Sequence, residues 1–364
     1  IDGCLRCQKL PPATHSRPRR ITTSMAQQHP KSARLLIIAD PRSPELAGLT
    51  LPPSVTLVGV GRTAEDFAGL SDAELASVDA LFLGGASTYA GTREHIKALW
   101  PRLTGLVWLH HKMAGVDALL FPELIQAKHV LVTNSKGVFS SPLAEWTLAA
   151  CNFFAKDMPR LRAAQKAGKW EQFEVEELRG KTMGVIGYGD IGEACARLAK
   201  AYKMRVVAMR RRTQLTEAEA AEGLVDKLYA VDQLEQLMAV SDYVVMVTPH
   251  TPATEKMVGA AALAAMKPTG VFINIGRGKC VDEEALVAAL QAGAIRGAAL
   301  DVFYTEPLPL TSPLWQLDNV LLSPHWGGCT KEFPAQAVQG FQENLERYVA
   351  GESLSNVVDK SAGY

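Results

Sequence analysis

The chain has 364 residues, of which 48% are hydrophobic and 21% are charged, a balance typical of a soluble globular protein with roughly two domains. Its 38 lysine and arginine residues equal its 38 aspartate and glutamate residues, so the net charge gives no support for binding to nucleic acid or to an acidic membrane surface. No apolar run reaches the length of about eighteen residues that a membrane span needs.

Residues 1–33 differ in composition from the rest of the chain, because they are basic, rich in hydroxyl side chains and nearly free of acids. This composition is typical of a transit peptide, and it favours a chloroplast or a mitochondrion as the location. A disordered tail, or translated sequence upstream of Met25, is the alternative and would favour the cytoplasm. Cys4 and Cys7 form a C-x-x-C pair in this tail, but no second pair completes a zinc set, so we expect no metal site.

The part of the chain that follows the tail alternates between strand-like and helix-like segments. Short apolar runs rich in β-branched residues predict strands at 34–40, 78–85, 103–111 and 129–134, and residues 92–103 predict a helix. Such alternation predicts a parallel sheet with helices on its faces.

Residues 141–170 are predicted to form one long helix. Ser141 can cap its start, and Pro142 lies in the first turn, where proline is tolerated. The apolar positions are spread around the helix, which indicates burial on more than one side. We expect this helix to join two domains or to pack against a partner subunit.

A second series of alternating strand-like and helix-like segments follows and is typical of a complete doubly wound unit. Its predicted strands are 182–187, 205–209, 242–247, 270–275, 297–303 and 319–323. A last helix is predicted at roughly 330–350, where it can return to the first domain.

The motif G-x-G-x-x-G occurs in this second series as Gly187, Gly189 and Gly192. It follows a predicted strand and opens a predicted helix, which is the context of a dinucleotide site. Gly187 allows a tight turn, Gly189 lets the backbone approach a pyrophosphate, and Gly192 lets helix and strand pack closely. The N–H groups of Asp190 and Ile191 would face the pyrophosphate at the helix N-terminus.

Three consecutive arginines, Arg210, Arg211 and Arg212, close the next predicted strand. An acid at the end of this strand would bind the ribose 2′-hydroxyl of NAD, whereas arginines would pair with the 2′-phosphate of NADP. We therefore favour NADP over NAD. A solvated charged face is the alternative for one or two of the three, because few side chains can reach one phosphate.

Hydride transfer to a 2-keto acid needs a cation for the carboxylate, an acid for the forming alkoxide and a partner for that acid. Arg277, Glu306 and His325 supply these chemical types near predicted strand ends. Taken singly, they could equally be a capping arginine, a loop glutamate and a core histidine.

The chain resembles the D-2-hydroxyacid dehydrogenase family over roughly residues 34–360. The resemblance rests on the segments "VIGYGDIG", "NIGRG", "VDEEAL", "ALDVFYTEP" and "SPHWGG", which occur in the family's order. It implies that His325 is the general acid/base, that Glu306 pairs with it, and that Arg277 binds the substrate carboxylate and carbonyl.

The resemblance also implies further site residues. The segment "KMAGVD" is similar to the substrate-carboxylate loop, in which the backbone N–H groups of Ala114 and Gly115 would bind an anion. Asp301 would lie near the nicotinamide carboxamide, and Trp326 would either shape the pocket or pack at the domain hinge. The predicted cofactor contacts are completed by Thr248, Pro249, Ile275 and Gly328.

The implied fold is α/β, with two doubly wound parallel-sheet domains, Rossmann- or flavodoxin-like, and a cleft between them. The substrate domain would comprise residues 34–137 and 329–364, and the dinucleotide-binding domain residues 138–328. A homodimer is expected from the family.

The sequence therefore predicts an NADPH-dependent reductase of a small 2-keto acid such as glyoxylate or hydroxypyruvate. One alternative is an NAD-linked enzyme for D-lactate or 3-phosphoglycerate. Another is a dinucleotide-sensing binding protein, which would bind the cofactor without turnover.

Overall fold

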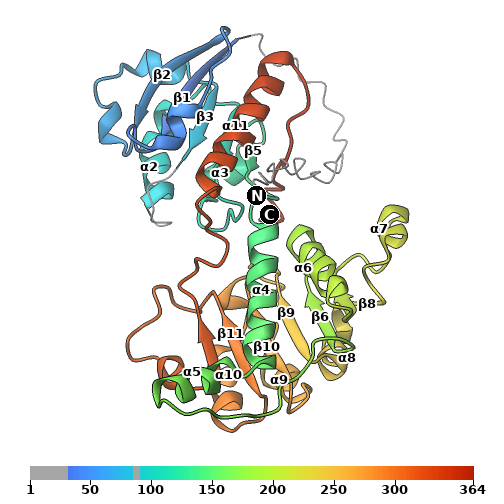
Figure 1. The fold of residues 1–364 in the computed structure, drawn as a ribbon. Coiled ribbons are helices and arrows are strands. Elements are labelled where there is room, and N and C mark those ends of the chain that lie inside the picture. Colours follow the sequence, from blue (N-terminus) through green and yellow to red (C-terminus); the bar gives the residue numbers. More distant parts are fainter. Residues whose placement is uncertain (1–31, 85–90) are drawn as a thin grey trace, which may run out of the picture.

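The computed structural model describes residues 32–84 and 91–364 and shows two α/β domains, one above the other in Figure 1. Each domain is built on a sheet whose paired strands are all parallel, one of five strands and one of seven. The predicted fold class is thus confirmed. Residues 1–31, with Cys4 and Cys7, lie outside the described residues, so the proposed targeting role of the tail stays a prediction.

The first domain has the strand order β2-β1-β3-β4-β5, which is the flavodoxin-like order. Its strands are β1 (Ala33–Ile38), β2 (Val55–Gly61), β3 (Ala80–Leu83), β4 (Trp108–His111) and β5 (Leu131–Asn134). Its helical segments are η1 (Pro44–Gly48), η2 (Glu65–Phe67), α1 (Asp72–Ala76), α2 (Gly91–Leu99), η3 (Trp100–Arg102) and α3 (Pro122–Gln126). β2 was not predicted from the sequence; it is an edge strand that is only partly buried and contains Gly59 and Gly61.

The last helix, α11 (Phe333–Ala350), packs on the first sheet although it follows the second domain in the chain. Side chains alternate between the two faces of a strand. Leu35 and Ile37 of β1 therefore meet Phe341 and Tyr348 of α11, while the intervening side chains face the opposite core. Figure 1 shows α11 lying against this sheet. The proposed domain boundaries at 137/138 and 328/329 stay predictions.

The expected single helix at 141–170 is wrong, because the structure breaks it into α4 (Ser140–Ala155) and α5 (Met158–Lys166). Asp157 lies between them in the left-handed conformation and accepts a hydrogen bond from the Arg160 N–H. Pro159 follows in the first turn of α5, where its missing N–H costs nothing. Ser141 is not the cap either, since α4 begins at Ser140 and the Ser141 hydroxyl donates to Glu145 within the helix.

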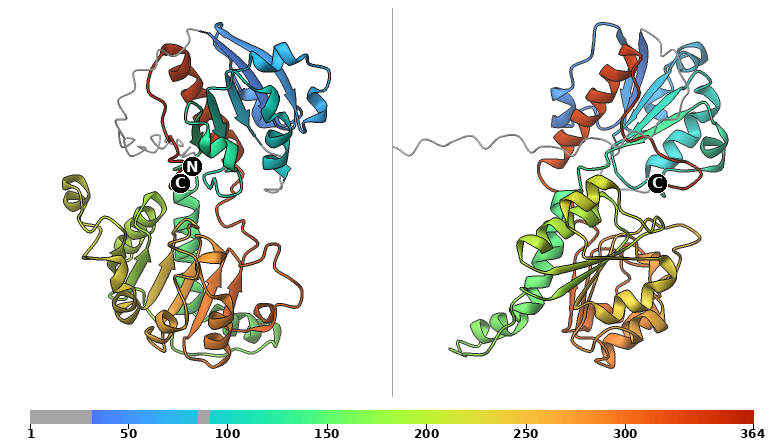
Figure 2. Two further views of the ribbon diagram at one scale, coloured as in Figure 1. Left: turned by 180° about the vertical axis from the view of Figure 1, so that it is seen from behind. Right: turned by 90° about the vertical axis from the view of Figure 1, so that its right-hand side faces the viewer.

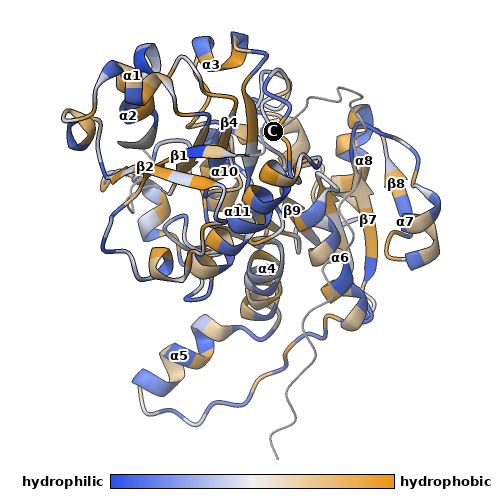
Figure 3. Ribbon diagram, turned by 90° about the horizontal axis from the view of Figure 1, so that it is seen from above, coloured by the Kyte–Doolittle hydropathy of each residue, from blue (hydrophilic) through white to orange (hydrophobic). Residues whose placement is uncertain are grey.

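α5 has no buried residue, and with the extended segment after it projects from the second domain (Figures 2 and 3). Trp170 in that segment is 93% exposed. α4, in contrast, packs against α6 (Asp190–Ala201) and one face of the second sheet. Among the helices of the described ranges, none is long and apolar enough to cross a membrane.

The second domain has the order β12-β11-β10-β9-β6-β7-β8, which is the doubly wound dinucleotide-binding order with a further strand at its edge. Its strands are β6 (Thr182–Ile186), β7 (Arg205–Met209), β8 (Lys227–Tyr229), β9 (Tyr243–Met246), β10 (Val271–Asn274), β11 (Gly297–Leu300) and β12 (Val320–Leu322). Its other helical segments are α7 (Glu217–Glu222), η4 (Val231–Gln233), α8 (Leu234–Val240), α9 (Ala260–Ala264), η5 (Gly278–Cys280), α10 (Glu283–Gln291) and η6 (Pro313–Gln316). β8, a strand of three residues, was not predicted from the sequence.

His110 and His111 at the end of β4 are buried, and this makes the first domain sensitive to acid. Burial lowers the pKa of His110 to about 3 and that of His111 to about 4. In the unfolded chain both rings titrate near a pKa of about 6.5. Between these values the unfolded state binds more protons than the folded state, so stability is retained above pH 6.5 and is lost as the pH falls toward 4.

We expect the free energy of unfolding of the first domain to fall by up to about 1.4 kcal/mol per pH unit for each of these histidines below pH 6.5. Urea unfolding between pH 7.5 and about 4.5 measures this slope. The variant His110→Asn/His111→Asn should have a shallower slope, whereas His129→Asn, at an exposed position, should not. An unchanged slope in the double variant would remove these two residues as the cause.

Candidate active site

The parallel second sheet brings the loops that carry the candidate residues to one edge. In parallel strands the carboxyl ends all meet at the same edge of the sheet. Gly187 follows β6, Thr248 follows β9, and Arg277 follows β10. Close backbone approaches join neighbouring loops, since a Cβ on Gly187 would lie 3.0 Å from Thr248 Cγ2 and one on Gly276 would lie 2.9 Å from the Thr248 carbonyl oxygen.

The three motif glycines meet different surroundings, which fit a dinucleotide. Gly187 has a φ of +100°, a conformation that side chains disfavour. A Cβ on Gly192 would lie 2.6 Å from the Gly187 carbonyl oxygen, so this glycine allows α6 to pack on β6. A Cβ on Gly189 would meet nothing within 4 Å. Gly189 caps α6 and is followed by Asp190 and Ile191, so an anion can approach the first N–H groups of the helix here.

Arg210 is held inside the protein by a carboxylate. Its guanidinium donates from Nη1 and Nη2 to Glu219 Oε1 and Oε2, each at 2.8 Å, and also to the carbonyls of Arg212 and Gln214. Both side chains of this pair are less than a tenth exposed. Arg210 thus fastens the loop between β7 and α7. Glu219 was not predicted as a partner of Arg210, although the capping box that it forms with Thr216 is visible in the sequence as T-x-x-E.

Arg211 and Arg212 are exposed next to Arg210. Nη2 of Arg212 donates to both carboxylate oxygens of Glu219, at 3.2 and 2.9 Å, and 47% of the Arg212 side chain stays exposed. The guanidinium of Arg211 lies over the ring of Tyr364, 5.3 Å from its centroid. The chain end thus returns to the region between the two domains, as Figure 1 shows. Of the three arginines, Arg211 and Arg212 remain the candidates for a phosphate.

His325 and Glu306 form a hydrogen-bonded pair beyond the ends of β11 and β12. Nδ1 of His325 lies 2.8 Å from Oε2 of Glu306, and Glu306 Oε1 accepts from the Phe303 N–H at 2.9 Å. Burial raises the pKa of Glu306, but the hydrogen bond and charge of His325 lower it more, so the pKa lies below its ordinary value. Glu306 is therefore a carboxylate near neutral pH and orients the imidazole through Nδ1.

Asp301 organises the loop that holds His325. Its buried carboxylate accepts from the N–H groups of Trp326 and Gly327 at 3.0 and 2.9 Å, and from the Ser323 hydroxyl. Its carbonyl accepts from the His325 N–H at 2.7 Å. His325 has a φ of 55°, which is uncommon outside glycine and is found at functional sites. Asp301, predicted from the sequence to lie near the nicotinamide, thus also fixes the backbone around His325.

Arg277 reaches across to the first domain. Its Nη2 donates to Oδ1 of Asp117 at 3.0 Å and its Nε to the same oxygen at 3.2 Å, while Nη1 donates to the Gly276 carbonyl at 2.7 Å. Burial raises the pKa of Asp117, but the charge and hydrogen bond of Arg277, a backbone hydrogen bond and the charge of His325 together lower it more, so Asp117 is ionised near neutral pH. Asp117 is the last residue of "KMAGVD", and this role for it was not predicted from the sequence.

The other candidates lie on neighbouring loops. Ala114 and Gly115 follow β4 in the loop that contains Asp117, and the Asn134 amide donates to the Ala114 carbonyl at 2.6 Å. Trp326 is 58% exposed, so its ring is not buried in the hinge. Three further cofactor candidates continue the ends of β9 and β10: Thr248, Pro249 and Ile275. Gly328 lies against the start of α4, since a Cβ there would be 3.0 Å from Phe139, which precedes the helix, and 3.1 Å from Leu143 within it.

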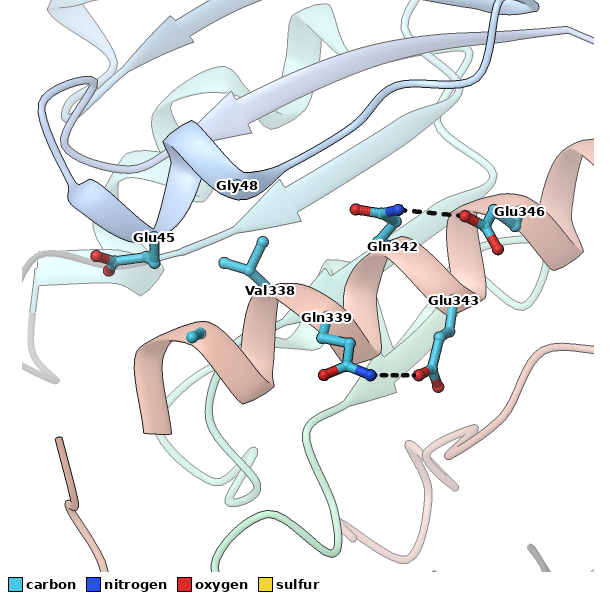
Figure 4. Close-up of a pocket in the computed structure, with 8 residues that line it drawn as sticks. Glu45, Gly48, Val338, Gln339, Gln342, Glu343 and Glu346 are labelled. Atoms are coloured by element: carbon cyan, nitrogen blue, oxygen red, sulfur yellow. Dashed lines mark hydrogen bonds between the residues drawn. The ribbon is translucent and has the colours of Figure 1, made fainter. Parts of the chain in front are cut away.

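A hollow of about 350 Å³ lies in the first domain, between η1 and α11 (Figure 4). Its polar lining includes Glu45, Glu343 and Glu346, and Gln339 and Gln342 each donate to the glutamate four residues later. Such i,i+4 pairs stabilise the surface of a helix. All the lining residues belong to η1 and α11, so the hollow is separate from the three candidate catalytic residues.

The chain matches one family model and several curated proteins. The family model described as "D-isomer specific 2-hydroxyacid dehydrogenase, NAD binding domain" matches residues 148–327. A glyoxylate reductase of Pyrococcus furiosus is 35% identical over 240 residues, which cover 64% of this chain and 69% of that protein. Glyoxylate/hydroxypyruvate reductase B of Pectobacterium carotovorum is 32% identical over 299 residues, which cover 80% of this chain and 89% of that protein.

A D-3-phosphoglycerate dehydrogenase of Methanocaldococcus jannaschii is 36% identical over 247 residues, which cover 67% of this chain. The match covers 46% of that protein, so the chain spans about half the length of this relative.

Solved structures show the same fold. A D-isomer specific 2-hydroxyacid dehydrogenase of Xanthobacter autotrophicus, crystallised with NADPH and MES, is 29% identical, and the match has a TM-score of 0.73 and covers 92% of this chain and 100% of that one. A D-isomer specific 2-hydroxyacid dehydrogenase family protein of Aeromonas salmonicida is 25% identical, with a TM-score of 0.75 and a coverage of 90% of this chain and 99% of that one.

Proposed function

Because the chain belongs to the D-isomer specific 2-hydroxyacid dehydrogenase family of NAD(P)-dependent oxidoreductases, we propose that it uses NADPH to reduce a small 2-keto acid, either glyoxylate to glycolate or hydroxypyruvate to D-glycerate. The observation that carries the proposal is the His325–Glu306 pair, which lies with Arg277 at one edge of the dinucleotide-type sheet. The glyoxylate reductase and glyoxylate/hydroxypyruvate reductase relatives support this substrate class.

His325 acts as the general acid in this proposal. Glu306 holds the ring through Nδ1, which leaves Nε2 as the nitrogen that transfers a proton. When NADPH is bound, it supplies the hydride that reduces the carbonyl carbon. Nε2 of His325 donates its proton to the carbonyl oxygen, and the Glu306 carboxylate stabilises the charged imidazole before that transfer.

Arg277 and the loop after β4 bind the substrate. The planar guanidinium of Arg277 can bind a carboxylate oxygen and the carbonyl oxygen of a 2-keto acid together. The N–H groups of Ala114 and Gly115 would hold the rest of the carboxylate. Asp301 keeps the His325 loop in place during both steps.

The preference for NADPH rests on Arg211 and Arg212. Both lie just beyond β7, where the adenosine ribose is bound in dinucleotide-binding domains, and both are exposed. Gly187, Gly189 and the N-terminus of α6 would hold the pyrophosphate. The NADPH complex of the Xanthobacter autotrophicus relative supports this cofactor.

A dehydrogenase acting on 3-phosphoglycerate is the second candidate, because one relative of similar identity bears that name.

A homodimer stays an expectation from the family, and α5 with its following segment is the projecting part that would contact a partner.

We expect reduction of glyoxylate and hydroxypyruvate with a kcat/KM at least about tenfold higher with NADPH than with NADH, the factor that 1.4 kcal/mol gives. Initial rates should be measured with both cofactors on glyoxylate, hydroxypyruvate, pyruvate and 3-phosphohydroxypyruvate, and the glycerate formed should be tested for the D-enantiomer. A clear preference for 3-phosphohydroxypyruvate would replace the proposed substrate. Cofactor binding without turnover would favour a dinucleotide sensor instead.

A further inference from the structure

The ion pair between Asp117 and Arg277 joins the two domains directly at the candidate active site. Asp117 belongs to the loop after β4 in the first domain, and Arg277 to the loop after β10 in the second. The side chains are 34% and 22% exposed, so the pair is partly shielded from water. The two Asp117 oxygens lie 3.2 and 3.3 Å from Nε of Arg277.

The loop that carries Arg277 is held in place by contacts of its backbone. Asn274 accepts from the Gly276 N–H and donates to the Arg277 carbonyl, and a Cβ on Gly278 would lie 1.9 Å from the Phe303 carbonyl oxygen. These contacts set the loop but leave the rotatable bonds of the arginine side chain undetermined. The Nε and Nη2 contacts to one carboxylate, with the Nη1 contact to Gly276, set the plane of the guanidinium.

We propose that Asp117 is a positioning residue that sets the orientation of Arg277 for the substrate carboxylate and carbonyl, and that it does so when the two domains are together. The proposal rests on the proposed function of Arg277 in binding a 2-keto acid. Because the two charges come from different domains, the arginine is oriented by the same approach of the domains that encloses the substrate. A correctly oriented guanidinium lowers the barrier by holding the carbonyl in the reacting geometry.

A purely structural latch between the domains is the competing explanation, and the chain offers a matched control for it. Lys136 and Asp190 form a second ion pair between the two predicted domains, with 3.5 Å between Nζ and Oδ2 and side chains 57% and 46% exposed. Lys136 lies outside the catalytic residues proposed above. Lys136→Met therefore removes a contact between the domains without touching Arg277.

We expect Asp117→Ala to raise the KM for the keto acid about tenfold and to lower kcat about tenfold, because the misaligned arginine affects both binding and the transition state. Asp117→Glu should recover part of both losses, since it keeps the charge at a longer reach. The NADPH dissociation constant, measured by fluorescence titration, should stay within about twofold in each variant. Lys136→Met should leave the KM for the keto acid and kcat unchanged.

Equal kcat and KM in wild type and Asp117→Ala would overturn the proposal, as would the same losses in Lys136→Met. Binding of oxalate to the NADP⁺ complex, measured by calorimetry, tests the arginine without turnover. Asp117→Ala should weaken oxalate binding about tenfold. In the Arg277→Lys variant the same substitution should weaken oxalate binding much less, and this difference is the coupling that a double-mutant cycle measures. If the wild type binds oxalate but reduces none of the keto acids, the proposed function fails while the oxalate comparison still decides the role of Asp117.

Discussion

Replacement of His325 by asparagine is expected to lower kcat by about a thousandfold, within the range that positioned general acids contribute. Asparagine cannot transfer a proton near neutral pH, but it keeps a polar side chain beside Glu306. The backbone around residue 325 should persist, because the Asp301 carboxylate holds the N–H groups of Trp326 and Gly327. Asparagine also tolerates the left-handed conformation found at this position. Initial rates with NADPH and hydroxypyruvate measure the loss.

The controls separate proton transfer from binding. The NADPH dissociation constant should stay within about twofold of the wild-type value, because no pyrophosphate-binding residue is changed. His129→Asn replaces an exposed histidine of the first domain and should keep the wild-type rate. Glu306→Gln should lose activity to a smaller degree, since an amide still accepts the hydrogen bond but carries no charge. A rate within about tenfold of wild type in His325→Asn would mean that another group is the acid.

The variant Arg211→Ala/Arg212→Ala is expected to lower kcat/KM for NADPH by about tenfold to hundredfold while leaving that for NADH nearly unchanged. Hydrogen bonds to charged groups contribute about 1.5 to 3 kcal/mol, and exposure of both arginines places the effect toward the lower end. Steady-state rates with each cofactor measure the preference. Equal losses with both cofactors, or none with either, would remove these arginines as the site of the 2′-phosphate.

Arg210→Ala should behave differently from its neighbours. It leaves the buried Glu219 carboxylate without its main partner, and breaking a buried pair costs about 3 to 5 kcal/mol. The cost here should lie near the lower figure, because Arg212 and the Thr216 N–H still contact Glu219. We therefore expect a lower melting temperature and a similar loss with both cofactors. Arg205→Ala, at the exposed start of the same strand, is the control for charge alone.

The dinucleotide motif could be predicted because its signals are local. A strand, a glycine turn and a helix follow one another at 182–201. Gly187 has a positive φ and Gly192 has a close backbone neighbour, whereas a Cβ on Gly189 would meet nothing within 4 Å. The order of the later motifs then placed Arg277, Glu306 and His325 after successive strands. Parallel pairing brings such strand ends together whatever the loops contain, so the shared edge of the site followed from the pattern.

The single helix predicted at 141–170 is a case in which a local sequence pattern gave a wrong prediction. Its composition favours a helix throughout, and a helix of that length would satisfy the apolar spacing. Asp157 in the left-handed conformation and Pro159 after it end α4 and start α5 in a new direction. The strand β2 was missed for the opposite reason: an edge strand with glycines and partial burial has a weak apolar pattern, and it is recognised only by its pairing with β1.

The sequence by itself determined the fold class, the dinucleotide motif and the chemical identity of the candidate catalytic residues, because these depend on periodicity, on backbone sterics and on residue type. Only the tertiary structure determined which charged side chains form ion pairs with one another. Arg210 pairs with Glu219 and is not left exposed for a phosphate, and Asp117 pairs with Arg277 of the other domain. Charge pairing depends on distances between segments far apart in the chain, and those distances are set by the packing of sheets and helices, not by spacing along the sequence.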